Sequence, residues 1–197
     1  MTTNEKIAAL RAAAKAAGAD AVLLMTSDPH CSEYLPDYYN ALPWFSGFTG
    51  ENSTLVVTQE GSALWCDGRF YVQADKQLAG TEIECMHAGS AGVPTVAEYL
   101  AAHVSAGQTL LLDGSCVPAD LAHQYADVLA KNGAVLKSQD VASAIWEASG
   151  ARPALPDTPC ELLTPAQTGA TAAEKVAQVR AELAKAGATA LAVTGLD

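Results

Sequence analysis

The sequence predicts an α/β domain in which a mixed sheet of about six strands carries helices on both faces. Residues 21–25 are a continuous apolar run, which is typical of a strand covered on both faces, and residues 109–113, with three successive leucines, predict a second buried strand. Residues 53–58 and 63–66 predict two further strands, and the short turn at residues 59–61 joins them as an antiparallel hairpin. Buried strands and a hairpin in one chain favour a sheet of mixed strand direction.

The remaining elements follow from apolar periodicity and from residues that end helices. Ile7, Leu10 and Ala14 predict a first helix that ends near Gly18. We expect two more strands, at residues 82–86 and 134–137, and further helices at residues 70–78, 95–104, 118–132 and 141–146. Strands and helices thus alternate after the hairpin, as in an α/β fold.

Composition excludes several classes of partner. The chain has 197 residues, 50% of them hydrophobic, and a formal net charge of −11. No basic patch is interleaved with aromatic residues, which argues against nucleic acid and anionic membranes as partners. No apolar run reaches the length of a membrane span.

Cysteine and histidine usage indicates a cytoplasmic protein without a metal site. The 5 cysteines are scattered, with no Cys-x-x-Cys pair, and we expect reduced thiols. The first residues lead directly into an amphipathic helix, so no signal peptide is expected. The 4 histidines, at positions 30, 87, 103 and 123, lie in different elements without metal-ligand spacing, so no zinc site is expected.

Residues 62–78 change from strand to helix and form a candidate functional corner. The strand breaks at Asp67-Gly68, where Asp67 is expected to cap the helix and Gly68 to permit a turn that other residues resist. Arg69 then lies at the carboxyl end of a strand, where open α/β sheets meet ligands and partner domains. The alternative is that Asp67 is only a cap and Arg69 only a solvated or locally paired side chain.

Two other features leave alternatives open. Residues 26–50 are long, aromatic and irregular, so they are either a functional or interface segment or a plug for the end of the sheet. Cys116 precedes a helix N-terminus, a position that can lower the pKa of a thiol. Because no histidine or acid can be assigned to Cys116, a nucleophilic role is not favoured.

The C-terminal part predicts a linker and the start of a second domain. The first domain is expected to span residues 1–150, and residues 151–170 contain repeated prolines typical of a semi-rigid linker. Residues 175–197 repeat the helix–glycine–strand–aspartate pattern of residues 6–28. Residues 171–197 therefore predict a truncated second domain of related architecture, and the chain is expected to be a fragment of a longer protein.

Four segments form a recognisable set by their order and spacing: residues 28–34, 44–50, 64–74 and Ile145-Trp146 ahead of Arg152-Pro153. Together they resemble the N-terminal domain of the Xaa-Pro aminopeptidases (aminopeptidase P) in the creatinase/prolidase group. Glu51-Asn52-Ser53 departs from the small Ser-Ala-Gly-like stretch expected of the family, and Cys31 and Cys66 are atypical. The resemblance implies a creatinase/prolidase N-terminal domain-like fold with a ribonuclease H-like motif.

For activity, the resemblance implies a parent protein that removes an N-terminal residue preceding proline. Two divalent metal ions, commonly manganese, would activate the attacking water in a separate C-terminal catalytic domain. No catalytic residue and no metal ligand is expected in this chain.

For this domain, the resemblance implies a role in homodimerisation and in walling the active-site cleft, with the catalytic domain of the same chain as partner. Arg69 would hold a carboxylate or carbonyl of a peptide with proline at its second position, and Tyr71, Trp44 and His30 would line the cleft. Core packing or stabilisation of the corner is the alternative for each of these four residues. Two competing functions remain: a self-sufficient enzyme that uses Cys116 or the loop around Trp44, and a creatinase-like relative or binding module.

Overall fold

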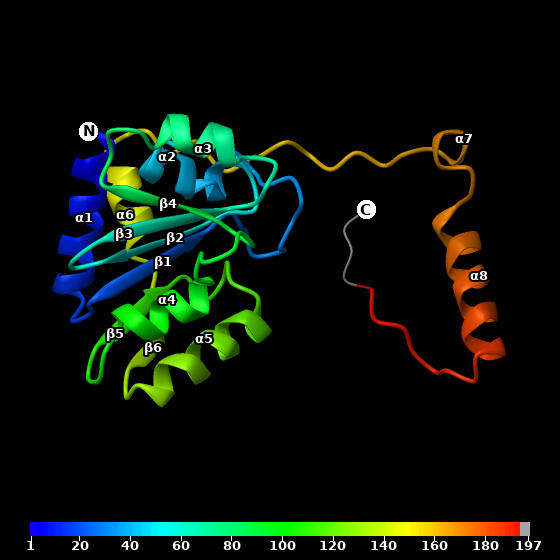
Figure 1. The fold of residues 1–197 in the computed structure, drawn as a ribbon. Helices are drawn as coiled ribbons and strands as arrows, with labels where there is room; N and C mark the ends of the chain where they lie inside the picture. Colours follow the sequence, from blue (N-terminus) through cyan, green and yellow to red (C-terminus); the bar gives the residue numbers. More distant parts are fainter. Residues whose placement is uncertain (194–197) are drawn as a thin grey trace. The chain divides into compact units, whose positions relative to one another are not determined.

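The computed structural model describes residues 1–193 and divides the chain into two compact units, Met1–Pro156 and Asp157–Asp197. The first unit is built on one 6-stranded sheet with the order β4-β3-β2-β1-β5-β6 (Figure 1). The strands are β1 (Ala21–Met25), β2 (Thr54–Thr58), β3 (Ser62–Cys66), β4 (Ile83–His87), β5 (Thr109–Leu112) and β6 (Val135–Ser138). Only β2 runs against its neighbours, so the other strands all point the same way. The predicted mixed sheet is confirmed.

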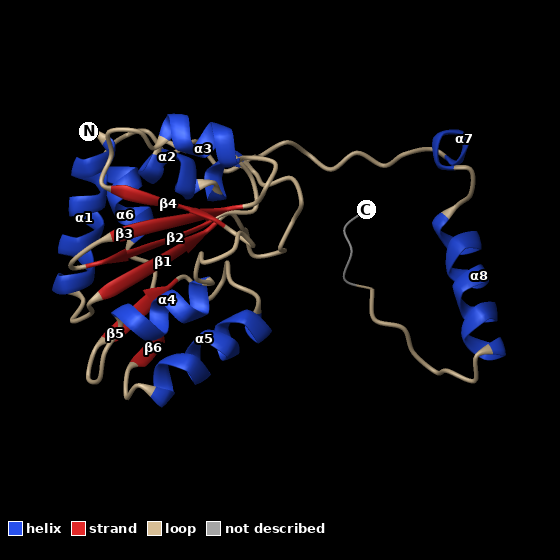
Figure 2. Cartoon of the chain, in the orientation of Figure 1, coloured by secondary structure: helices blue, strands red, loops and turns tan. Residues whose placement is uncertain are grey.

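Helices cover both faces of this sheet (Figure 2). One face carries α1 (Thr3–Ala16), α2 (Ala41–Ser46), α3 (Tyr71–Gln77) and α6 (Ala142–Ala148). The other carries α4 (Val96–His103) and α5 (Ala119–Lys131). A short 3-10 helix, η1 (Asp37–Tyr39), lies in the long segment between β1 and α2.

The two-sided cover explains the unbroken apolar runs of the central strands. Val22 of β1 pairs in register with Val57 of β2 and Leu111 of β5, and all three pack into the core beneath α1 and α2. Leu23, one residue further along β1, faces the core beneath α4 and α5. Each of these buried aliphatic side chains contributes about 1.5–3 kcal/mol through its removal from water.

The corner after β3 differs from the sequence prediction. α3 begins at Tyr71, and no side chain caps its N-terminus. Asp67 Oδ1 instead accepts a hydrogen bond from the backbone N–H of Arg69 at 2.9 Å, which closes the turn before the helix starts. Gly68 does not have a positive φ, and a Cβ there would lie 3.9 Å from the Tyr71 ring, an ordinary contact. The turn therefore depends on the Asp67 carboxylate, and Gly68 is not required for it.

The second unit contains α7 (Pro165–Thr168) and α8 (Ala172–Lys185). Thr171 and Glu174 form a capping box at the start of α8, as Thr2 and Glu5 do at the start of α1, and both helices have 14 residues. Residues 188–193 form neither helix nor strand, and residues 194–197, where the expected strand ends, lie outside the described part. Among residues 1–193 no helix combines the length and apolarity needed to cross a membrane.

Candidate functional site at the carboxyl edge of the sheet

Five strands end at the same edge of the sheet because all but β2 share one direction. We call this the carboxyl edge; it is marked by the last residues of the five strands, Met25, Cys66, His87, Leu112 and Ser138. Ligands of open α/β sheets bind beyond such edges, at points where successive connections leave for opposite faces. The chain after β1 leads to α2 on one face, whereas the chain after β5 leads to α5 on the other. The gap between β1 and β5 is therefore a topological switch point.

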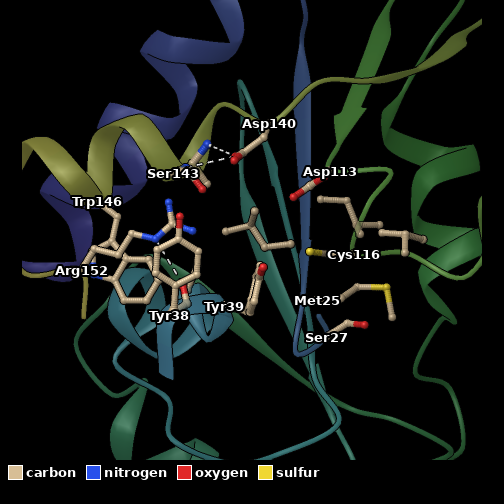
Figure 3. A pocket seen from close by; sticks show the side chains of 15 residues that line it. Met25, Ser27, Tyr38, Tyr39, Asp113, Cys116, Asp140, Ser143, Trp146 and Arg152 are labelled. Atoms are coloured by element: carbon tan, nitrogen blue, oxygen red, sulfur yellow. Dashed lines mark hydrogen bonds between the residues drawn. The ribbon is translucent and has the colours of Figure 1, made fainter. Parts of the chain in front are cut away.

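A cavity of about 300 Å³ lies at this switch point (Figure 3). We call it the switch-point pocket. Its lining comes from the ends of β1, η1, the loops after β5 and β6, α6 and Arg152. Concave sites of this size at switch points are the usual place for a small ligand or an inserted side chain.

One wall of the switch-point pocket is aromatic and is held together by Arg152. The Arg152 guanidinium lies 3.7 Å from the centre of the Tyr38 ring and 5.6 Å from the Trp146 ring (Figure 3). Its Nε–H donates to the Tyr38 carbonyl at 3.2 Å, and Nη1 pairs with Glu147 Oε1 at 2.6 Å. Arg152 thus ties η1 to α6, and its charge is already balanced by Glu147.

The other wall is acidic. Asp113 Oδ1 accepts from the backbone and the hydroxyl of Ser115, and Asp140 Oδ1 accepts from the backbone N–H groups that open α6. These bonds fix both carboxylates in turns at the ends of β5 and β6. Two carboxylates beside a guanidinium that is already paired make the pocket electronegative, which favours cationic over anionic groups.

Cys116 lies on this wall but is not activated. Burial, reinforced by the charges of Asp113 and Asp140, raises the pKa of its thiol to about 11. The thiol is therefore protonated at neutral pH, and the lowering expected from a helix N-terminus does not occur. Cys116 therefore does not supply a thiolate nucleophile to the pocket.

The Arg69 corner lies elsewhere on the carboxyl edge, beyond β3. Arg69 Nη2 and Asp67 Oδ2 are 2.7 Å apart, and Nε contacts both carboxylate oxygens of Asp67. Hydrogen bonding to Asp67 raises the pKa of Arg69 and lowers the pKa of Asp67, and Glu51 and Glu33 reinforce the rise. The Arg69 side chain is 61% exposed, so it is locally paired yet open to solvent.

The aromatic residues singled out in the sequence point in different directions. The Tyr71 ring stacks on the His87 ring with centroids 4.2 Å apart, and its hydroxyl donates to the Ala88 carbonyl. Trp44 is half-buried in α2 under Lys6, whose Nζ lies 4.4 Å from the ring centre, and stacks on Trp146 at 6.2 Å. Tyr71 thus serves the contact between α3 and β4, whereas Trp44 supports the aromatic wall of the switch-point pocket from behind.

His30 is exposed in the loop after β1, where its backbone N–H donates to Asp28 Oδ1 at 2.8 Å. Within residues 1–193 no hydrogen bond, ion pair or ring contact links His30 to Arg69, Tyr71 or Trp44. The structure therefore brings Asp67, Gly68, Arg69 and Tyr71 together at one corner and leaves His30 and Trp44 apart from it.

Sequence reasoning singled out Cys116 and noted Trp146 and Arg152 in a motif, but it did not predict that they line one pocket with Asp113 and Asp140. A usable signal was present for Asp113 and Asp140, because acidic residues soon after buried strands lie at the carboxyl edge. No local signal joins Arg152 to Tyr38, since 114 positions separate them along the chain.

Comparison with known proteins gives a consistent family. The Creatinase/Prolidase N-terminal domain family matches residues 6–147. Aminopeptidase P2 of Arabidopsis thaliana is 32% identical over 202 residues, which is 100% of this chain and 28% of the relative. A probable Xaa-Pro aminopeptidase P of Sordaria macrospora is 34% identical over 200 residues, again 100% of this chain and 32% of the relative. The chain thus spans about a third of the length of these curated relatives.

Solved structures agree. The X-prolyl aminopeptidase of Caenorhabditis elegans, described as a cytosolic enzyme with a di-nuclear active site, superposes with a TM-score of 0.81 at 30% identity. The match covers 95% of this chain and 32% of that one. The N-terminal domain of the cytoplasmic peptidase PepQ from Mycobacterium tuberculosis gives a TM-score of 0.51 at 25% identity, over 72% of this chain and 98% of that one. The resemblance drawn from the sequence motifs is confirmed.

Proposed function

The chain belongs to the creatinase/prolidase N-terminal domain family, and we propose that it is the non-catalytic N-terminal part of a metal-dependent Xaa-Pro aminopeptidase. The observation that carries the proposal is the 0.81 TM-score to the Caenorhabditis elegans X-prolyl aminopeptidase over 95% of this chain. The parent protein would hydrolyse the bond between an N-terminal residue and proline in the cytoplasm. Two divalent ions, manganese in our proposal, would reside in its C-terminal catalytic domain.

The chemistry of the carboxyl edge supports a binding role. The one thiol of the switch-point pocket, Cys116, is protonated, and the carboxylates of Asp113 and Asp140 are fixed by hydrogen bonds in turns. Asp67 pairs with Arg69, so a substrate carboxylate would have to share Arg69 with it. These groups suit recognition and positioning more than bond cleavage.

The second unit supports the start of a related domain. Val176 and Val179 of α8 occupy the repeat positions of Ile7 and Leu10 of α1. Ile7 and Leu10 are 0% exposed, whereas Val176 and Val179 are 47% and 42% exposed. We propose that residues 171–197 begin a second domain, whose sheet covers this apolar stripe, and that residues 151–170 connect the two domains.

We further propose that the carboxyl edge walls the active-site cleft in a homodimer. Arg69 would contact the substrate, with Tyr71, Trp44 and His30 shaping the surface around it. A wall of this kind limits substrate size and excludes water from the site. Arg69 fits this role because it is exposed, permanently charged and restrained by Asp67 in one orientation.

The test compares the full-length protein with this chain on a peptide that has proline at its second position. We expect cleavage by the full-length protein with manganese, loss of cleavage with a chelator, and no cleavage by this chain. Cleavage by this chain alone would refute the non-catalytic role. If neither protein cleaves, the peptidase proposal fails and a creatinase-like or binding role takes its place.

The wall is tested in the full-length protein with Arg69→Ala. A substrate contact predicts a raised KM, whereas a purely local ion pair predicts unchanged kinetics. Lys131→Ala, at the exposed end of α5, is the control that should leave the kinetics unchanged.

A further inference from the structure

Three metal-ligating side chains meet where α3 packs against the edge strand β4. Asp75 comes from α3, and Cys85 and His87 lie two residues apart on the same side of β4. His87 Nε2 and Asp75 Oδ1 are 2.8 Å apart, and one ligand atom from each of the three residues lies within 4.8 Å of the others. The spacing of histidines along the chain predicted no zinc site. It did not point to this cluster, because the three side chains come from two elements and only one of them is a histidine.

We propose that Asp75, Cys85 and His87 bind one zinc ion. A thiolate, an imidazole and a carboxylate are the three ligand types that zinc takes in proteins, whereas magnesium and calcium prefer oxygen alone. Tetrahedral coordination at usual bond lengths places neighbouring ligand atoms about 3.3–3.6 Å apart. The imidazole and carboxylate therefore need to separate by only about half an ångström to admit the ion.

The surroundings hold the ligands in place and leave a position for solvent. The Tyr71 ring lies nearly parallel to the His87 ring, at 7°, and the Tyr71 hydroxyl is anchored on the Ala88 carbonyl, so the imidazole is restrained. The side chains of Asp75 and His87 are 53% and 33% exposed. Water can thus reach the ion and fill a fourth position.

Cys85 lies on the inner side of the site. Its thiol contacts the Asp75 carboxylate and the thiol of Cys66 on β3, and burial raises its pKa to about 12. Zinc binds the thiolate, so the thiol proton leaves to solvent as the sulfur–zinc bond forms. The ion would tie α3 to β4, one of the two edge strands of the sheet.

Cobalt(II) is a suitable probe, because a thiolate ligand gives it a charge-transfer absorption that carboxylates and imidazoles do not. The titration uses a variant with Cys31→Ser and Cys160→Ser, because these substitutions remove the two exposed thiols as sources of adventitious metal binding. We expect one equivalent of cobalt to develop the thiolate band and one equivalent of zinc to abolish it. The absence of a thiolate band would overturn the proposal.

Two pairs of variants locate the ion. The control for Cys85→Ser is Cys116→Ser, because Cys116 also carries a partly buried thiol beside a carboxylate. His87→Gln is matched by His103→Gln, whose imidazole stacks on a tyrosine at 3.9 Å. Loss of a ligand should weaken zinc binding by at least about 100-fold, because removal of even an outer-shell partner costs roughly 10–100-fold. The matched controls should bind as the parent chain does.

Asp75→Asn is the ligand variant that should not disturb folding, because Asp75 lies on the exposed side of α3 and asparagine has nearly the same shape as aspartate. We expect native circular dichroism together with weakened zinc affinity. Zinc affinity unchanged in Cys85→Ser or Asp75→Asn, or lost instead in Cys116→Ser, would overturn the assignment.

Discussion

Arg152 offers the sharpest test of how the switch-point pocket is built. The guanidinium stacks on Tyr38, donates to the Tyr38 carbonyl and pairs with Glu147. Its side chain is only 10% exposed, although it lies close to the end of the first unit. Arg152→Ala removes all these contacts at once and so removes the link between η1 and α6.

The magnitude follows from the individual contacts. A partly desolvated cation–π contact such as that with Tyr38 contributes about 0.5–2 kcal/mol. A hydrogen bond from a charged donor to a partly buried carbonyl, such as that of Tyr38, contributes about 1.5–3 kcal/mol. The ion pair adds about 0–1 kcal/mol, because Glu147 is 58% exposed and solvent screens it. Since these contributions overlap, we expect Arg152→Ala to lower the free energy of unfolding by about 2–4 kcal/mol.

Urea unfolding followed by tryptophan fluorescence measures this loss, and Trp146 reports on the site directly. Arg152→Lys keeps the charge but loses the planar stack and the forked donors, so it should recover less than half of the loss. Arg69→Ala is the control, because its ion pair with Asp67 is exposed and should affect stability little. If Arg152→Ala destabilises the chain no more than Arg69→Ala, the account of the aromatic wall is wrong.

Further predictions concern the rest of the first unit. Gly50→Ala would place a Cβ in direct overlap with the buried ring of Phe48 and should lower the free energy of unfolding by about 1–3 kcal/mol, as measured by urea unfolding. Gly68→Ala should change it by no more than about 0.5 kcal/mol. A larger effect at Gly68 would contradict the corner geometry. Burial alone would raise the pKa of Asp28, but hydrogen bonds from backbone N–H groups lower it on balance. The ionised Asp28 carboxylate therefore stabilises the fold fully above the unfolded pKa of about 4, and this stabilisation is lost as pH falls through the lower folded pKa. Asp28→Asn should therefore flatten the loss of stability below about pH 4, and an unchanged acid profile would refute the assignment. Cys116 should react with iodoacetamide more slowly than the exposed cysteines, and an equal rate at neutral pH would show a thiolate that the structure does not support.

The layered fold was predictable because its signals are local and repeated. A strand covered on both faces should be apolar on both sides, and residues 21–25 and the three leucines at positions 110–112 meet that condition. The prediction of two-sided helix cover needed only the alternation of strands and helices. That prediction did not assign each helix to a particular face of the sheet; only the structure gives this assignment.

The corner after β3 was predicted less well because one side chain can satisfy different backbone groups. An aspartate before a helix is a common cap, yet Asp67 lies too early and binds the N–H of Arg69 within the turn. The same carboxylate then captures the Arg69 guanidinium. Composition and spacing do not distinguish a capping carboxylate from one that closes the preceding turn.

The switch-point pocket and the proposed zinc ligands depend on pairing between distant segments. Arg152 reaches Tyr38 only because α6 returns to the face that carries η1 and α2. Asp75 reaches His87 only because α3 lies against the edge strand that follows it. The sequence can predict that acidic residues lie at strand ends. Contacts between residues of distant segments can be found only from the three-dimensional path of the chain.

The two copies of the repeat separate what a helix encodes from what its surroundings supply. α1 and α8 share a capping box and a helix length, which are local properties and form in both. Their apolar stripes differ in burial, since Leu10 is 0% exposed and its counterpart Val179 is 42% exposed. The exposed residues of α8 have counterparts in α1 that form part of a core. They therefore mark the face of α8 that the proposed second domain must cover. The same comparison explains why residues 188–193 form no strand where residues 21–25 form β1: a strand exists only with a neighbour to accept its hydrogen bonds.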